Sequence, residues 1–251
     1  MIKAIFFDID GTILNGNKGI PESTLLALAK LKERGIETII CTGRGYDETM
    51  ALNIENIDAY ILLNGQIAYD NKDNVLYKKP IKNKDKLIEL FNSKKIPFGL
   101  VDERNTYLNY IDDYVRYVHD TVNLRMPEVK EYNGQDIYQA LAYGKVKDYI
   151  EKELPDFMAT SWHFDGVDIV PKSSGKDKGI IEYCSLRNID IKDTMAFGDG
   201  DNDRKMLETA GIGVAMGNSI DTVKAVADYV TDSIKEDGVY NALVHFGVID
   251  D

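Results

Sequence analysis

The feature that most constrains the fold is a series of short apolar runs, each of which ends in polar residues and glycine. The first run spans residues 4–7 and continues directly into Asp-Ile-Asp-Gly-Thr at 8–12. A second run at 38–41 ends in Thr-Gly-Arg at 42–44. Short continuous apolar runs bounded by turn signals are typical of strands buried on both faces of a parallel sheet. The two runs therefore predict two strands of such a sheet.

The segment between these runs predicts a helix. Pro21 has the character of a helix start, Leu25, Leu28 and Leu31 recur at helical spacing, and Gly35 supplies a stop. Strand, helix and strand joined by loops of this length form a βαβ unit.

The last third of the chain repeats this alternation. Strands are predicted at 194–197, 213–216 and 229–230, with helices through 205–207 and over about 219–227. The pattern predicts an α/β fold with a parallel-sheet core. In such folds ligands lie at the carboxyl ends of the strands, where Asp8, Thr42 and Asp199 fall.

The middle of the chain predicts a different architecture. Alternating, tyrosine-rich segments lie among polar helical candidates, which are found near 83–93, 111–121 and 145–152. This mixture predicts an inserted α+β domain with an antiparallel sheet. Asn64-Gly65 is interpreted as a hairpin turn that opens the insertion. The predicted domains are 1–80 with 172–251 for the core and 81–171 for the insertion.

Composition excludes several classes of protein. The net charge of -12 argues against a nucleic-acid partner, because phosphate backbones are bound by clustered Lys and Arg. Two cysteines make no disulfide framework, and three dispersed histidines make no zinc cluster. No apolar run reaches the roughly 18 residues that span a bilayer, and no signal-peptide pattern is present. We expect a cytoplasmic protein without a membrane partner, and a monomer by default.

The first motif with chemical meaning is Asp8-Ile9-Asp10-Gly11-Thr12. Two carboxylates two residues apart at a strand exit can converge on one ligand, because Gly11 permits a sharp turn. Carboxylate oxygens suit a hard cation such as Mg²⁺. An acidic loop with a glycine turn is the equally good structural interpretation of this motif taken alone.

Three further motifs stand in order along the chain. Thr42-Gly43-Arg44 can donate to phosphate oxygens, or can simply cap a helix. The acidic segment 198–203 can complete a cation site, or can stabilise the next helix through its dipole. Lys176 and Lys178 stand at a helix start, where a lysine is misplaced unless an anion is near, although a solvated lysine is the default.

Taken in order, these motifs resemble the haloacid-dehalogenase superfamily. Within it, the long insertion resembles that of the Cof-type branch with a type IIB cap, and the resemblance covers nearly the whole chain, including Asp237-Gly238-Val239. The resemblance implies the HAD fold, a Rossmann-like parallel-sheet core with an inserted α+β cap. It also implies a Mg²⁺-dependent phosphatase that hydrolyses a small phosphorylated metabolite, with sugar phosphates as the first expectation.

Residue by residue, the resemblance implies Asp8 as the nucleophile that forms an aspartyl-phosphate and Asp10 as the general acid and base. Magnesium would be held by the Asp8 carboxylate, the Asp10 backbone carbonyl and Asp199, and Asp203 would orient the ligands and Lys178. The implied phosphate-binding residues are Thr42, Gly43, Lys178 and Asn202.

Two points stay open at this stage. Lys-Gly followed by an apolar helix favours Lys178 over Lys176, but both lie within reach of the site. Asp10 favours hydrolysis of phosphate monoesters over a receiver or pump, yet a sugar phosphomutase needs the same acid. A phospho-binding or signalling protein without turnover is the alternative from another class.

Overall fold

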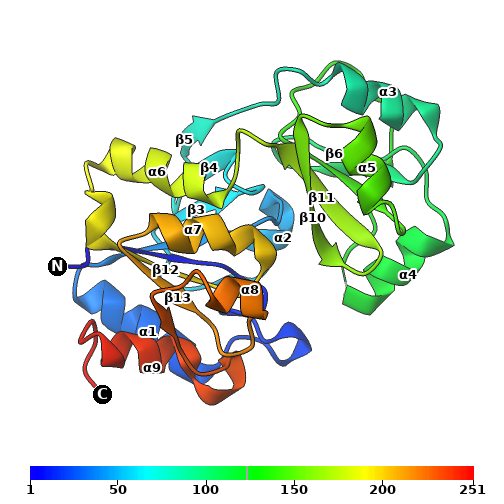
Figure 1. Cartoon of the computed structure of the whole chain (residues 1–251). Coiled ribbons are helices and arrows are strands. Elements are labelled where there is room, and N and C mark those ends of the chain that lie inside the picture. The colour runs from blue at the N-terminus through cyan, green and yellow to red at the C-terminus, as the bar shows by residue number, and fades with distance from the viewer. Residues whose placement is uncertain (123) are drawn as a thin grey trace. The chain divides into compact units, whose positions relative to one another are not determined.

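The computed structural model describes residues 1–122 and 124–251, and the chain divides into two compact units (Figure 1). The first unit contains Met1–Thr42, Ile54–Tyr77 and Gly175–Asp251, and the second contains Gly43–Asn53 and Lys78–Ser174. The prediction places the boundaries of the insertion at 80/81 and 171/172. In the structure the chain passes between the units at 77/78 and 174/175. The segment 43–53, which the prediction placed in the core, groups with the second unit.

The first unit is built on an eight-stranded sheet in the order β14-β13-β12-β1-β2-β3-β4-β5. Neighbouring strands from β14 to β3 run parallel, whereas β4 is antiparallel to β3. Its strands are β1 (Ala4–Phe7), β2 (Glu37–Cys41), β3 (Ala59–Leu62), β4 (Ile67–Asp70), β5 (Val75–Lys78), β12 (Thr194–Gly198), β13 (Ile212–Ala215) and β14 (Tyr229–Val230). The predicted α/β fold with a parallel-sheet core is confirmed.

Helices cover both faces of this sheet. Helices α6 (Lys176–Arg187) and α7 (Arg204–Thr209) pack together on one face, and α1 (Glu22–Glu33) and α9 (Gly238–His245) pack together on the other (Figure 1). The short helix α8 (Asp221–Lys224) follows β13. Because both faces are covered, the central strands are apolar throughout, and all of β1 is buried.

The core of the first unit forms where these strands and helices meet. Phe7 and Phe197 lie on adjacent strands with ring centroids 5.1 Å apart, and Phe6 packs edge-on against Tyr183 of α6. On α1, Leu28 and Leu31 are fully buried, whereas Leu25 is 41% exposed. The buried face of α1 is therefore narrower than its leucine spacing predicts.

The second unit contains a six-stranded sheet in the order β10-β11-β9-β6-β7-β8. All neighbouring pairs are antiparallel except β7 and β8. The strands are β6 (Phe98–Val101), β7 (Thr106–Leu108), β8 (Glu128–Val129), β9 (Gln139–Tyr143), β10 (Phe157–His163) and β11 (Gly166–Pro171); the helices are α2 (Tyr46–Met50), α3 (Asp85–Ser93), α4 (Asp113–Val122) and α5 (Lys147–Glu153). This unit has an apolar core of its own, to which Leu87, Phe98 and Ile169 belong.

The turn at Asn64-Gly65 differs in part from its prediction. It is a hairpin turn, since β3 and β4 pair antiparallel across it. It does not open the insertion, because β4 and β5 continue the eight-stranded sheet of the first unit. The sequence signal for a hairpin holds no information about which sheet the second strand joins.

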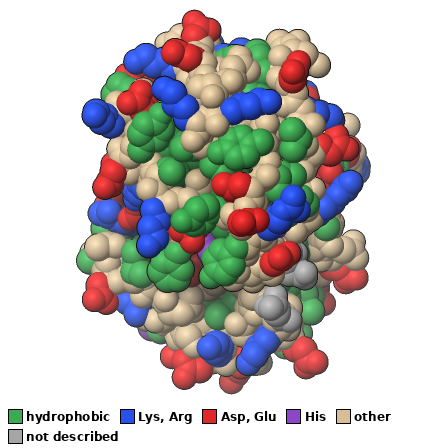
Figure 2. Space-filling model, turned by 90° about the vertical axis from the view of Figure 1, so that its right-hand side faces the viewer, with side chains coloured by type: hydrophobic (Ala, Val, Ile, Leu, Met, Phe, Trp, Pro, Cys, Tyr) green, Lys and Arg blue, Asp and Glu red, His purple; other side chains and the backbone are tan. Residues whose placement is uncertain are grey.

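The described surface carries mixed charge. On the face that Figure 2 shows, Lys and Arg side chains are scattered between acidic and hydrophobic ones, so the described residues there form no continuous basic track. No helix among the described residues is both long and apolar enough to cross a membrane.

Candidate active site

Asp8 stands directly after β1, at the carboxyl end of a central strand. Its backbone N–H donates to the carbonyl of Phe197 at 3.0 Å, which fixes it beside β12. The residue is only 7% exposed. Asp10, two residues on, has an exposed side chain. The left-handed Gly11 (φ 80°) turns the chain back, and a β-carbon at this position would lie 2.1 Å from Asp199 Oδ2. Glycine at this position therefore lets two acidic loops approach each other.

Lys176 is the cation that meets Asp8. Its Nζ lies 2.5 Å from Asp8 Oδ1 and 2.6 Å from Asp203 Oδ1, and its side chain is completely buried. Lys176 is the first residue of α6, where the helix dipole disfavours a positive charge. The two carboxylates compensate for that position.

Asp203 ties the lysine to the loop after β12. While Oδ1 contacts Lys176, Oδ2 accepts from the backbone N–H groups of Asp199 and Gly200 at 3.0 and 2.9 Å. Both oxygens of this fully buried side chain are thus already engaged. Asp203 is placed to orient its neighbours.

Asp199 is held from two other loops. The hydroxyl of Thr12 donates to Oδ1 at 3.4 Å, and Asn218 Nδ2 donates to Oδ2 at 3.2 Å. The same Asn218 amide also donates to the carbonyl of Gly11 at 2.9 Å. The loops after β1, β12 and β13 are therefore joined at this carboxylate.

Thr42 and Asn202 are connected through Asn64. Thr42 ends β2 and is 1% exposed, and its carbonyl accepts from the backbone N–H of Asn64 at 2.9 Å. The side-chain oxygen of Asn64 accepts from Asn202 Nδ2 at 3.0 Å. Gly43 follows Thr42 but belongs to the second unit, where its carbonyl accepts from Gln139 Nε2 at 3.2 Å.

The acidic cluster carries more negative charge than Lys176 can neutralise. Asp8, Asp199 and Asp203 each bring a carboxylate oxygen within 4.8 Å of the others, against the single ammonium of Lys176. Burial raises the pKa of Asp199 to about 7, and Asp203 raises it further than Lys176 lowers it. Burial also raises the pKa of Asp8, which Lys176 opposes. Burial lowers the pKa of Lys176, but Asp203 and Asp8 more than reverse this. A divalent cation would balance the excess negative charge, and oxygen donors are the ligands that Mg²⁺ prefers.

Lys176, and not Lys178 as the motif predicts, is the lysine that the structure brings to Asp8. The Lys178 side chain is 53% exposed, and its Nζ lies 3.3 Å from Asp177. Successive helical residues are turned by about 100°, so side chains two positions apart lie nearly on opposite faces of α6. Only Lys176 reaches Asp8.

Two residues at the site were not found from the sequence. The sequence indicates Asn64 only as part of a turn, whereas its left-handed conformation (φ 53°), its burial and its hydrogen bond with Asn202 place it at the site. Asn218 follows β13 at a strand end, as the other site residues do, and that position was its only signal in the sequence.

Comparison with known proteins adds an independent finding. The sequence profile described as haloacid dehalogenase-like hydrolase matches residues 5–243. YkrA of Bacillus subtilis is 34% identical, and the match covers 98% of each chain. The 5-amino-6-(5-phospho-D-ribitylamino)uracil phosphatase YitU of the same organism is 29% identical, over 96% of each chain. The solved structure of the HAD subclass IIB sugar phosphatase BT4131 superposes with a TM-score of 0.87 at 31% identity, covering 98% of this chain and 100% of that one.

Proposed function

The chain belongs to the haloacid dehalogenase-like hydrolases and is a phosphatase of the Cof type, and we propose that it hydrolyses small phosphate monoesters through an aspartyl-phosphate on Asp8. The observation that carries this proposal is the buried chain Asp8–Lys176–Asp203, with a second carboxylic acid at Asp10. A nucleophile held against a fixed cation, with an acid two residues away, suits attack on a phosphate ester.

In the first step, the Asp8 oxygen attacks phosphorus and the bond to the leaving oxygen breaks. Asp10 gives its proton to that oxygen, which departs as an alcohol. Lys176, which contacts the nucleophile Asp8, is proposed to neutralise charge on the attacked phosphoryl group, and Thr42, Gly43 and Asn202 are proposed to donate to its other oxygens. Fixed donors are effective here because charge spreads over these oxygens in the transition state.

In the second step, water attacks the aspartyl-phosphate. Asp10, now a carboxylate, takes a proton from the water, inorganic phosphate leaves, and the Asp8 carboxylate is restored. Asp203 positions Lys176 and the backbone of residues 199–200 throughout, by the three hydrogen bonds that its carboxylate accepts.

The acidic cluster fits Mg²⁺ as the resident cofactor. The Asp8 and Asp199 carboxylates and the Asp10 backbone carbonyl are the proposed ligands, since both oxygens of Asp203 are engaged. When bound, Mg²⁺ neutralises charge on the phosphoryl oxygens. For the substrate we propose sugar phosphates, because BT4131 is a sugar phosphatase and YitU acts on a phosphorylated ribityl compound.

The first experiment measures phosphate release from sugar phosphates, nucleotides and phosphorylated cofactors with Mg²⁺. We expect the wild type to release phosphate and Asp8→Asn to release less than a few per cent of it. The amide keeps the shape of the side chain but is not a nucleophile. Turnover by Asp8→Asn comparable to the wild type would show that Asp8 is not the nucleophile.

A chelation experiment serves as the control for the metal. Excess EDTA should abolish release and added Mg²⁺ should restore it, whereas full activity in EDTA would contradict the cofactor. If no ester is hydrolysed, the assay is repeated with a sugar bisphosphate activator, and transfer in place of hydrolysis would identify a mutase.

A further inference from the structure

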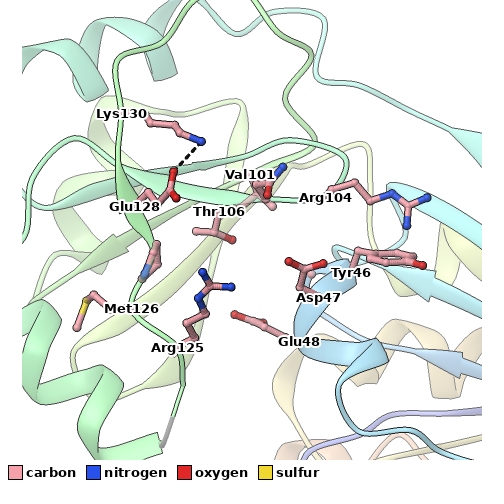
Figure 3. A pocket seen from close by; sticks show the side chains of 13 residues that line it. Tyr46, Asp47, Glu48, Val101, Arg104, Thr106, Arg125, Met126, Glu128 and Lys130 are labelled. Atoms are coloured by element: carbon pink, nitrogen blue, oxygen red, sulfur yellow. Dashed lines mark ion pairs between the residues drawn. The ribbon is translucent and has the colours of Figure 1, made fainter.

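Charged side chains gather at a cavity of the second unit as well as at the acidic cluster of the first. The cavity has a volume of about 150 Å³ and is lined by the start of α2, the β6–β7 hairpin and the segment before β8 (Figure 3). Three acidic and three basic residues line it, namely Asp47, Glu48, Glu128, Arg104, Arg125 and Lys130. These charges are equal in number, so the excess negative charge that a cation would balance lies at the acidic cluster.

The side-chain amide of Asn218 contacts two of the loops that carry the proposed cation ligands. One N–H of its Nδ2 donates to the carbonyl of Gly11 at 2.9 Å, and the other donates to Asp199 Oδ2 at 3.2 Å. Asp199 is a proposed ligand, and Gly11 directly follows Asp10, whose carbonyl is another. Because both bonds leave one planar nitrogen, the amide sets the spacing between these two ligands.

The amide is itself held by the C-terminal part of the chain. Asn218 Oδ1 accepts from the backbone N–H of Ile234 at 2.9 Å. The preceding residue, Gly217, donates its N–H to the carbonyl of Asp232 at 3.0 Å, and a β-carbon on Gly217 would lie 2.6 Å from the Ser233 nitrogen. Both N–H groups and the oxygen of the Asn218 amide are thus engaged, although the residue is exposed.

The tail motif Asp237-Gly238-Val239 shapes the segment that holds the amide. Asp237 has a left-handed conformation (φ 61°), and the N–H of Gly238 donates back to the carbonyl of Ser233 at 3.1 Å. A β-carbon on Gly238 would lie 2.0 Å from the carbonyl oxygen of Asp232. Glycine therefore lets this turn close, and the closed turn places the N–H of Ile234 against Asn218.

An amide orients the Asp199 carboxylate without neutralising it. Thr12 donates to one oxygen of Asp199 and Asn218 to the other, so the plane of the carboxylate is fixed from two sides. An ionised carboxylate has about four lone-pair sites, and these two bonds leave the others for a cation. A lysine or arginine in place of Asn218 would instead compete with the cation through its charge.

We propose that Asn218 is a positioning residue of the cation site, which holds the Asp199 carboxylate and the loop at Gly11 at the spacing that Mg²⁺ requires. The inference rests on the proposed Mg²⁺ cofactor, which it deepens by naming a residue that sets the geometry of the ligands without being one of them. Mg²⁺ demands nearly ideal octahedral geometry, whereas Ca²⁺ accepts a flexible one. Loss of the Asn218 amide should therefore weaken Mg²⁺ binding more than Ca²⁺ binding.

The test is a calorimetric titration of the full chain with Mg²⁺ and, separately, with Ca²⁺, in the absence of any phosphate ester. Asn218→Ala should weaken Mg²⁺ binding by about tenfold or more, the loss typical of removing a group that orients a metal ligand. It should weaken Ca²⁺ binding by less than about threefold. Asn218→Leu, which keeps the approximate size of the side chain without its hydrogen bonds, should give the same result. The matched control is Asn74→Ala in the β4–β5 turn, where another exposed asparagine donates to a carboxylate, that of Asp70, at 2.8 Å. This control should change neither affinity.

The outcomes separate this inference from the proposed function. Urea unfolding of each variant shows that it is folded under the conditions of the titration. Unchanged Mg²⁺ affinity in the two Asn218 variants, or equal losses of Mg²⁺ and Ca²⁺ affinity, would overturn the inference alone. Absence of Mg²⁺ binding by the wild type would contradict the proposed cofactor and this inference with it. The proposed hydrolysis fails by its own criterion, which is the absence of phosphate release from every ester by the wild type.

Discussion

At the scale of single residues, the central feature is a lysine shared by two buried carboxylates. Removing Lys176 would leave Asp8 and Asp203 without their cation in a buried site. Breaking a buried ion pair by removing one partner costs about 3–5 kcal/mol. The lysine therefore supports both the proposed chemistry and the stability of the first unit.

This gives a paired prediction for the two lysines of α6. Lys176→Met should abolish phosphate release and lower the free energy of unfolding by about 3–5 kcal/mol. Lys178→Met should leave kcat/KM within about twofold and stability within about 0.5 kcal/mol, because its side chain is largely solvated. Phosphate release and urea unfolding of both variants are the measurements. Loss of activity in Lys178→Met with retention in Lys176→Met would refute the assignment.

The same pair shows what residue types alone could and could not predict. Asp8, Asp10 and Asp199 follow apolar strands, so their positions at strand ends could be predicted. The choice between the two lysines depends on which face of α6 each one occupies. Lys176 shares a face with Ile180 and Cys184, which are buried, whereas Lys178 shares one with Ile181, which is 45% exposed. The Lys-Gly motif therefore favours Lys178, whereas the helical periodicity indicates Lys176, which is the lysine that contacts Asp8 in the structure.

At the scale of secondary-structure elements, the hairpin turn between β3 and β4 packs against the start of α6. Leu63 and Asn64 both have positive φ values, 52° and 53°, as does Gly65 at 92°. A β-carbon on Gly65 would lie 2.3 Å from the carbonyl oxygen of Gly175, next to Lys176. The turn thus fixes where α6 begins, and with it the position of the lysine.

Gly65→Ala tests this contact against a matched glycine. Gly35 also has a positive φ of 67° but has no atom within 4 Å of an added β-carbon. Gly35→Ala should cost about 1 kcal/mol of stability from backbone strain and leave kcat/KM unchanged. Gly65→Ala should cost about 1–3 kcal/mol more and lower kcat/KM, since α6 must shift. Equal effects of the two substitutions on both readouts would show that the close approach is unimportant.

Elements were predicted best where the signal was local. The strand at residues 4–7 coincides with β1, and the strands at 194–197 and 229–230 correspond closely to β12 and β14. The helix expected over about 219–227 is reduced to Asp221–Lys224. Strand β5 could not be assigned to its sheet, because pairing depends on partners far along the chain.

At the scale of the whole molecule too, features set by local sequence could be predicted, and features set by contacts between distant segments could not. The existence of a second domain followed from its composition and alternating pattern. The grouping of Gly43–Asn53 with that domain could not be predicted in this way, because it rests on contacts between segments far apart in sequence. The polar cavity lined by α2 and the β6–β7 hairpin could not be predicted for the same reason.

The acidic cluster also has a consequence for the stability of the whole chain. Burial raises the pKa of Asp199 to about 7, against about 3.9 in an unfolded chain. Between these values the folded protein holds a proton that the unfolded chain has released. Stability contributed by this group therefore falls as pH rises from about 4 to about 7 and is lost above that range. In metal-free protein, a site built to hold a cation opposes folding at neutral pH.

Asp199→Asn removes the titrating group and keeps its shape. In EDTA, we expect the Tm of this variant to exceed that of the wild type by a margin that grows between about pH 4 and about pH 7 and then levels. Comparing the two proteins cancels groups whose pKa does not depend on Asp199, such as His119, whose pKa is lowered by burial. Mg²⁺ should raise the Tm of the wild type at pH 8, because a ligand that binds only the folded state stabilises it, and should do so far less in the variant. Parallel Tm curves in EDTA would contradict the raised pKa, and an equal response to Mg²⁺ would remove Asp199 from the metal site. If both expectations hold, the negative charge that destabilises the metal-free chain is the same charge that binds the cofactor.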